Sequence, residues 1–266
     1  MEKTKQQLAK QAECEARHQP PRSCLNHPVG GWTEDLPEKA EDCGFPPQLI
    51  WVNELNDVWM EIPRYMNLGR EGIWSPPFLL FIVPILMAFL ILLPEEAFYT
   101  LSIFLFSFVI FLSLFSALYR IKSVLFEPQG APVRFNRKRQ KVYVYGFNKS
   151  FLPWRRWRPV IKEFDWKDIH GERVMIQTDA DRGYRIYCAV CKPDTFDVVD
   201  RFILTWTLDG IDEAGGLWSF CCRYMEKKPV PTAPLDREKP RYRTPFKNVK
   251  WPEYVARESS TAPEED

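Results

Sequence analysis

The chain has 266 residues, of which 36 are Lys or Arg and 35 are Asp or Glu, so its formal net charge is only +1. Apolar residues make up 45% and charged residues 27%, which are ordinary values for a globular protein. This composition excludes collagen-like, coiled-coil and wholly disordered chains, and the near-zero net charge argues against a nucleic-acid partner. Charged and apolar residues are unevenly distributed, however, so each segment predicts something different.

The first segment, residues 1–48, contains several Pro and Gly residues with few apolar residues between them, which predicts a mobile N-terminal arm. Its opening MEKTKQQLAKQAE lacks the apolar run of a cleaved signal peptide, so none is expected. Residues 49–76 form a pre-membrane segment in this interpretation. Within it, residues 49–66 alternate loosely between apolar and polar side chains and are suited to pair with a later sheet.

Two long uncharged runs follow. Residues 72–94 and 97–119 carry no charge, and each would span roughly 34 Å as a helix. They predict a transmembrane helical hairpin over 77–119, with helices near 77–93 and 98–119. Lys and Arg flank the runs and are absent from the turn between them, which predicts that both termini are cytoplasmic. The expected topology is therefore that of a multi-pass membrane protein.

The segment 133–226 predicts a cytoplasmic α+β domain. Short runs of alternating apolar residues predict strands up to about residue 206, with turns at Arg137–Gln140, His170-Gly171 and Arg182-Gly183. Apolar residues at helical spacing predict a helix over 211–225. A bent antiparallel sheet closed by one C-terminal helix resembles pleckstrin-homology-like domains in architecture alone. Residues 229–266 are Pro-rich and charged, which predicts a disordered tail.

Catalytic and metal motifs are weak. The chain contains no nucleophile elbow, Walker A loop, dinucleotide-binding glycine motif or zinc-protease motif, so neither an enzyme nor a cofactor is expected. An enzyme would have to depend on His170 and Asp168, which the pattern places in a solvated turn. The alternative of a zinc site formed by Cys14, His18, Cys24 and His27 has a spacing that matches no common zinc finger, and no metal site is predicted.

The seven cysteines are predicted to be free thiols in a reducing compartment, because their number is odd and their spacing suggests no disulfide framework. Cys188 and Cys191 form an isolated CxxC within a predicted strand. Residues three apart in a strand point to opposite faces, which is unsuitable for chelation. These two residues are therefore predicted to belong to the core.

A basic cluster is the main candidate site. Residues 120–158 carry eleven Lys or Arg and one acidic residue, and tryptophans alternate with arginines near the end of this stretch. Such a patch suits anionic lipid headgroups or an acidic partner, and the alternative, that it serves only as a topology signal, stays open. The candidate residues are Arg134, Arg137, Lys138, Arg139, Lys141, Trp154, Arg155, Arg156, Trp157 and Arg158.

Several stretches together resemble a proteobacterial two-span family of unknown biochemistry, often encoded in type VI secretion and polymorphic-toxin loci. They are GWTEDLPEKAEDCGFPP, PVRFNRKRQKVYVYGF, DWKDIHGERV and LWSFCCRYMEKKP, within about 31–229. The resemblance implies a role near secreted toxins, as an immunity or accessory protein, and supplies no catalytic residues. The expected function is thus a non-catalytic binding protein anchored in the inner membrane, with bilayer lipids and a toxin, effector or secretion protein as partners. A lipid-sensing or scaffolding module is the alternative.

Overall fold

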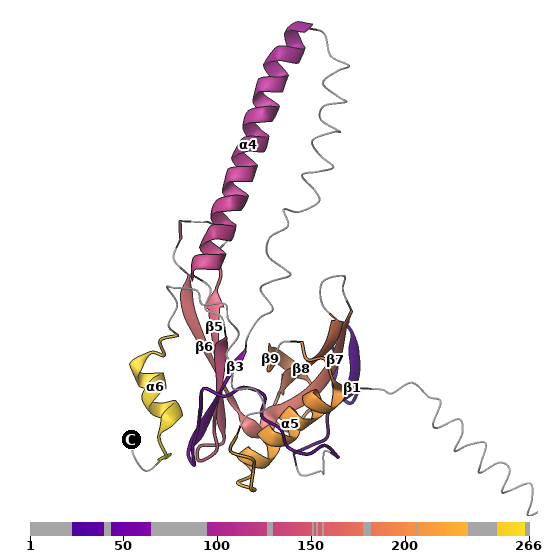
Figure 1. Ribbon diagram of the computed structural model, residues 1–266, viewed down its shortest axis with the longest axis vertical. Helices are drawn as coiled ribbons and strands as arrows, with labels where there is room; N and C mark the ends of the chain where they lie inside the picture. The colour runs from indigo at the N-terminus through magenta and orange to yellow at the C-terminus, as the bar shows by residue number, and fades with distance from the viewer. Residues whose placement is uncertain are drawn as a thin grey trace, which may run out of the picture.

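Two antiparallel sheets form the frame of the computed structural model (Figure 1). The structure describes residues 23–39, 44–64, 95–126, 130–150, 152, 154–155, 157–177, 182–205, 207–233 and 249–263. One sheet has the order β1-β7-β8-β9 and the other β2-β3-β4-β5-β6. The strands are β1 (Trp32–Asp35), β2 (Glu54–Leu55), β3 (Trp59–Arg64), β4 (Ala131–Asn136), β5 (Lys141–Asn148), β6 (Arg158–Asp165), β7 (Ile169–Gln177), β8 (Arg182–Cys191) and β9 (Val198–Ile203).

The hairpin of β4 and β5 follows the predicted pattern. Its two strands are joined by the four-residue turn 137–140, and Phe135 pairs with Val142 while Val133 pairs with Val144. These four side chains are buried on the same face of the sheet, because alternate residues of a strand share a face. The register therefore buries the apolar residues of the hairpin in the core.

A single turn of 3-10 helix, η1 (Trp166–Asp168), forms the corner between the sheets by linking β6 to β7. Near this corner the rings of Phe164 and Phe202 stack, with centroids 5.8 Å apart, and so join β6 to β9. His170 and Gly171, which the sequence places in a turn, lie instead inside β7. The reason is close packing, since a Cβ at Gly171 would lie 2.8 Å from a ring carbon of Trp218.

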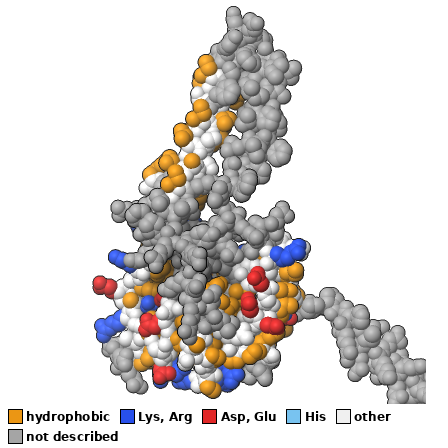
Figure 2. All heavy atoms as spheres, viewed as in Figure 1, with side chains coloured by type: hydrophobic (Ala, Val, Ile, Leu, Met, Phe, Trp, Pro, Cys, Tyr) orange, Lys and Arg blue, Asp and Glu red, His pale blue; other side chains and the backbone are white. Residues whose placement is uncertain are grey.

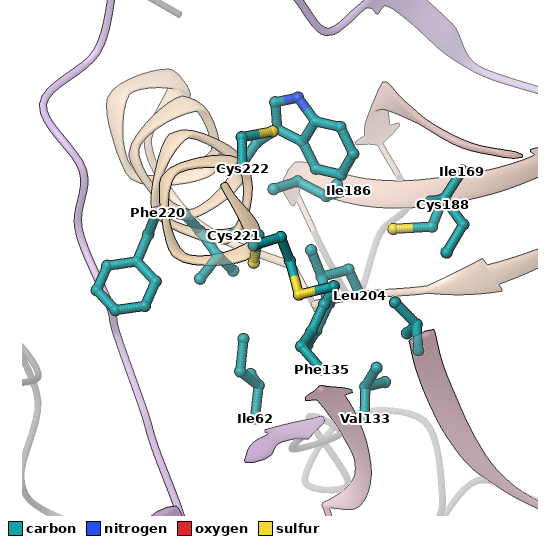
Figure 3. Packing of buried hydrophobic residues seen from close by; sticks show 14 of the residues in the cluster. Ile62, Val133, Phe135, Ile169, Ile186, Cys188, Leu204, Phe220, Cys221 and Cys222 are labelled. Carbon is teal, nitrogen blue, oxygen red and sulfur yellow. The ribbon is translucent and has the colours of Figure 1, made fainter. Parts of the chain in front are cut away.

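The helix α5 (Ile211–Met225) covers the core, as the helical spacing predicts. Trp218, Phe220, Cys221 and Tyr224 are almost fully buried. Figure 3 shows side chains of α5 together with Phe135, Ile186 and other residues of both sheets. Cys188 lies in this main core, whereas Cys191 lies in a second cluster with Leu25 and Ala189, so the predicted opposite orientation of the two cysteines is confirmed.

Part of the expected N-terminal arm belongs to the folded domain. The strand β1 pairs with β7, Leu36 is buried, and Phe45 packs so closely on α5 that Gly215 leaves no room for a Cβ. Further on, β3 pairs with β4 along its whole length. Leu25 and Leu36 are the only buried apolar residues within the described stretch 23–39, which explains why sequence periodicity does not reveal β1.

The helix α4 (Glu95–Phe126) corrects the prediction of a transmembrane hairpin over 77–119 and of a multi-pass inner-membrane protein. Within the described ranges, no helix has both the length and the apolarity that a membrane crossing requires. The first expected span, 77–93, lies outside the described residues. In the second, Phe115 and Tyr119 contact Trp154 and Trp157, so the end of that apolar run packs on the folded domain.

The rest of α4 projects from the sheets in Figure 1. Figure 2 shows apolar side chains along the helix that projects from the domain. Exposed apolar residues of α4 include Ile103, Phe104, Phe108, Phe111 and Leu114. Counting uncharged residues identified this run as apolar, but it could not show that the last turns of the helix have protein neighbours. The fold class is therefore an α+β domain of antiparallel sheets with few helices.

The predicted disordered tail, 229–266, contains a helix. α6 (Glu253–Ser260) lies beside β4, and its residues Val255 and Ser259 are buried. Apolar spacing in this stretch is too sparse to predict a packed helix, and among its described residues Val255 is the only buried apolar one. Polar contacts hold the segment instead.

Candidate functional site

The structure divides the basic cluster between two places. Residues of the β4–β5 hairpin face the C-terminal segment 249–263, which we name the docked tail. Trp154, Arg155 and Trp157 lie instead between β5 and β6, near the end of α4, and Arg158 begins β6. Arg156 lies outside the described residues. We name the first place the tail cradle and define it by Trp59, Glu61, Arg134, Asn136, Tyr143 and Tyr145.

Arg134 lies at the centre of the tail cradle. Its guanidinium lies between the rings of Trp59 and Trp251, 4.6 and 4.5 Å from their centroids. It also pairs with Glu61 at 2.6 Å and donates a hydrogen bond from Nη1 to Ser259 Oγ at 2.9 Å. Trp251 Nε1 donates to the same carboxylate of Glu61 at 3.0 Å. Two strands and the docked tail thus share one partly desolvated ion pair, which strengthens each contact.

Asn136 is fully buried and recognises the end of α6. Its Nδ2 donates to the carbonyl oxygens of Ser259 at 3.2 Å and Thr261 at 2.9 Å. Its Oδ1 accepts hydrogen bonds from the backbone N–H groups of Lys138 and Arg139, in the turn of the hairpin. One side chain therefore shapes the turn and also satisfies carbonyls at the C-terminal end of the helix, which lack partners within the helix itself.

Two tyrosines extend the contact along β5. Tyr143 donates from its hydroxyl to Glu258 Oε1 at 3.0 Å, and Tyr145 donates to the carbonyl of Lys250 at 3.2 Å. The ring of Tyr145 also meets that of Trp251 edge-on, with centroids 5.1 Å apart. Burial and the hydrogen bond to Glu258 raise the pKa of Tyr143 far above its usual value, so this hydroxyl remains a donor at any physiological pH.

The other basic residues of the hairpin also have partners. Arg139 donates to the carbonyls of Thr261 and Ala262, both at 3.1 Å, and Lys141 lies 3.5 Å from Glu258. Arg137 pairs with Asp57 at 3.1 Å and covers the ring of Tyr224. Lys138 is exposed. Cations around the C-terminal end of α6 are favourable, because the helix dipole places partial negative charge there.

We name the second place the α4 foot and define it by Lys122, Trp154, Arg155, Trp157 and Arg158. Lys122 is only 8% exposed; its Nζ lies 4.9 Å from the centroid of Trp157 and donates to the carbonyl of Leu152 at 3.1 Å. Trp154 is 74% exposed, and Arg155 and Arg158 are exposed as well. Part of the predicted patch is thus free to meet a partner, while Lys122 and Trp157 hold the helix.

A groove opens beside Arg64, the last residue of β3. It has a volume of about 530 Å³ and is lined by Arg64, Val144, Tyr145, Gly146, Phe147, Asn148, Val160, Lys162, Arg201, Phe202 and Ile203. Sequence analysis did not find it, because its three basic residues lie on three strands that are distant in the chain. We name it the Arg64 groove.

The weaker sequence candidates do not assemble into a site. His170 Nδ1 lies 2.7 Å from Glu38 Oε1, and this hydrogen bond lowers the pKa of the Glu38 carboxyl. Among the described residues, no group of three or more His, Cys, Asp or Glu side chains is placed to hold a metal ion. Of the four candidate zinc ligands, Cys14 and His18 lie outside the described residues.

Comparison with known proteins gives a family and no function. A model of a family of unknown function, DUF6708, matches residues 108–245, which is more than half of the chain. The chain belongs to this family. The match begins within α4 and includes β4 to β9 and α5, whereas β1 to β3 and the docked tail lie outside it. No curated protein and no solved structure matches the chain.

Proposed function

We propose that this member of the DUF6708 family is a non-catalytic binding protein that receives a helical segment in its tail cradle. The docked tail is the observation that carries the proposal. In this proposal the docked tail represents the kind of ligand that the β3–β5 face binds, a short helix preceded by a tryptophan. The contacts recognise general features of such a segment, namely the carbonyls at its C-terminal end and one aromatic ring.

The chemistry of the tail cradle suits exchange between ligands. Most of its contacts with the docked tail are polar, and Val255, at 4% exposure, is the one apolar residue of the docked tail that is buried. When a segment held in this way dissociates, it exposes little apolar surface to water. Another helix with similar polar groups can therefore replace it. The tail in this proposal is the intramolecular occupant of a partner-binding site.

We further propose that the partner belongs to a toxin or type VI secretion locus and that the chain acts there as an immunity or accessory protein. The support is the resemblance described above, of which the family match supplies only the unknown-function part. The test is deletion of the gene in a strain that carries an adjacent toxin gene. Loss of survival against sibling cells, restored by the wild-type chain and not by the Asn136→Ala variant, is expected. Unchanged survival after deletion would refute the immunity role.

A scaffolding role for the α4 foot is a second candidate, favoured by its exposed Trp154, Arg155 and Arg158. We expect the double change Arg155→Ser and Arg158→Ser to weaken binding to an acidic protein partner about tenfold at low salt, because two exposed cations are lost. Binding is measured by titration at two salt concentrations, with Arg182→Ser as the matched control, since Arg182 is an exposed arginine on β8. Equal affinities of the double variant and the control would remove the foot from the binding surface.

A further inference from the structure

The walls of the Arg64 groove combine apolar side chains with three basic ones. Val144, Phe147, Val160, Phe202 and Ile203 supply apolar surface, and Arg64, Lys162 and Arg201 supply positive charge. No residue of the described lining is acidic. Pockets that are largely apolar with a few convergent polar groups are the usual form of small-ligand sites.

Arg64 is the unusual member of the lining. Its Nε donates to the carbonyl of Ala131 at 2.7 Å, its Nη1 to that of Ile203 at 3.3 Å, and its Nη2 to that of Tyr145. These are three of the five N–H groups of a guanidinium, so one N–H on each terminal nitrogen has no acceptor in the described part of the chain. No carboxylate among the described residues pairs with this cation either.

Burial acts on Arg64 in the direction expected for such a cation, since it lowers the pKa of the guanidinium to about 10. The group is still charged at neutral pH, and its charge is balanced only by carbonyl dipoles. A bound oxyanion would supply both the missing charge and two acceptors, in the forked geometry that a guanidinium prefers.

The two other cations are oriented by acids outside the groove lining. Lys162 pairs with Asp200 at 2.6 Å, and Arg201 pairs with Glu172 at 2.8 Å. Lys162 remains 48% exposed, and its ammonium has three donors, of which one bond goes to Asp200. It can therefore contribute a second contact to an anion beside Arg64.

The edge of β9 excludes an added strand as the occupant. The Arg201 N–H donates to the side chain of Asp200 at 2.8 Å, and the Ile203 carbonyl accepts from Arg64. Side chains thus occupy backbone groups that an incoming peptide strand would need, a common way to block strand addition. The occupant must bind through its own charged group and through apolar contact.

We propose that the Arg64 groove binds a small organic oxyanion, a carboxylate or phosphate monoester that carries an apolar group. The anion lies against Arg64 and Lys162, and the apolar group lies against Phe147 and Val160. This site shares Tyr145 with the tail cradle but does not depend on the function proposed for it.

The test is calorimetric titration of the full-length chain with phenyl phosphate, phenylacetate and inorganic phosphate. The two aromatic probes are expected to bind more tightly than inorganic phosphate, and their order tells which oxyanion the groove prefers. Lys162→Gln is expected to weaken binding of the preferred probe about tenfold, since one charge-assisted contact is lost. Val160→Asp, at a position 40% exposed, is expected to weaken it at least as much by placing a negative charge in the wall.

Arg182→Gln, at an exposed position on β8 outside the groove lining, is the control and is expected to leave the affinity unchanged. Because Arg64 also joins β3 to β4, β5 and β9, the two surface variants rather than an Arg64 variant carry the test. Absence of binding by all three probes would overturn the proposal. So would affinities that neither Lys162→Gln nor Val160→Asp changes, and equal affinity for inorganic phosphate would refute the apolar half of the site.

Discussion

Replacing Trp218 by alanine is expected to lower the free energy of unfolding by about 3–5 kcal/mol, the range for loss of a large aromatic side chain from a core. Trp218 is 1% exposed, packs against Trp166 and against Gly171, and donates from Nε1 to the Pro37 carbonyl at 2.9 Å. Its loss leaves a cavity between α5 and β7 together with an unsatisfied carbonyl. Chemical denaturation of the two proteins measures the difference.

The matched control for Trp218 is Tyr254→Ala, because Tyr254 is also aromatic but is 72% exposed. It is expected to change the free energy of unfolding by less than about 0.5 kcal/mol, as is usual for surface positions. If Trp218→Ala lowered the free energy of unfolding no more than this control, the described packing of α5 on the two sheets would be contradicted.

Asn136→Ala is expected to release the docked tail and to destabilise the domain by about 2–4 kcal/mol. The change removes two hydrogen bonds to the tail carbonyls and leaves the N–H groups of Lys138 and Arg139 without their acceptor. Hydrogen exchange measures the release directly, since amides of 253–261 should exchange much faster in the variant while those of α5 keep most of their protection.

Asn148→Ala is the control for this second change, because Asn148 lies on the same strand pair but is exposed. It should leave exchange in α6 as it is in the wild type. Slow exchange of α6 in the Asn136 variant would mean that the tail is held by contacts other than those of the tail cradle.

The strands and the helix of the domain could be read from the sequence because their apolar residues repeat with clear periods. The alternation around Val142 and Val144 placed β5, and the helical spacing of Leu217, Cys221 and Tyr224 placed α5. His170-Gly171 misled the same analysis, since glycine is typical of turns but here makes room for Trp218. A sequence gives no indication of which distant side chain needs that space.

The candidate site could be predicted only as a concentration of positive charge. The cluster includes Arg134, Arg139 and Lys141, but the contact partners Glu61, Glu258 and Ser259 are far away in the chain. Partners at such separations follow from the fold and leave no local pattern. The sequence analysis counted Pro252 among the prolines of a disordered tail, although this residue is the N-cap of α6.

The transmembrane prediction failed for a related reason. The prediction depended on the absence of charged residues. A lack of charge indicates that a segment can enter a bilayer, but it does not indicate which other residues of the protein the segment contacts. Phe115 and Tyr119 are side chains that a bilayer could accommodate, but they contact Trp154 and Trp157 of the folded domain. Contacts between segments some forty residues apart are invisible to a sliding count of charges.

The central claim is that the tail cradle is a receptor for a helical segment and that the tail occupies it. The most direct measurement is binding of a labelled peptide, residues 249–263, to a chain that ends at residue 248. The account predicts saturable binding that Asn136→Ala abolishes, and much weaker binding to the full-length chain, whose own tail competes. Failure of the shortened chain to bind the peptide, or equal binding by the full-length chain, would contradict it.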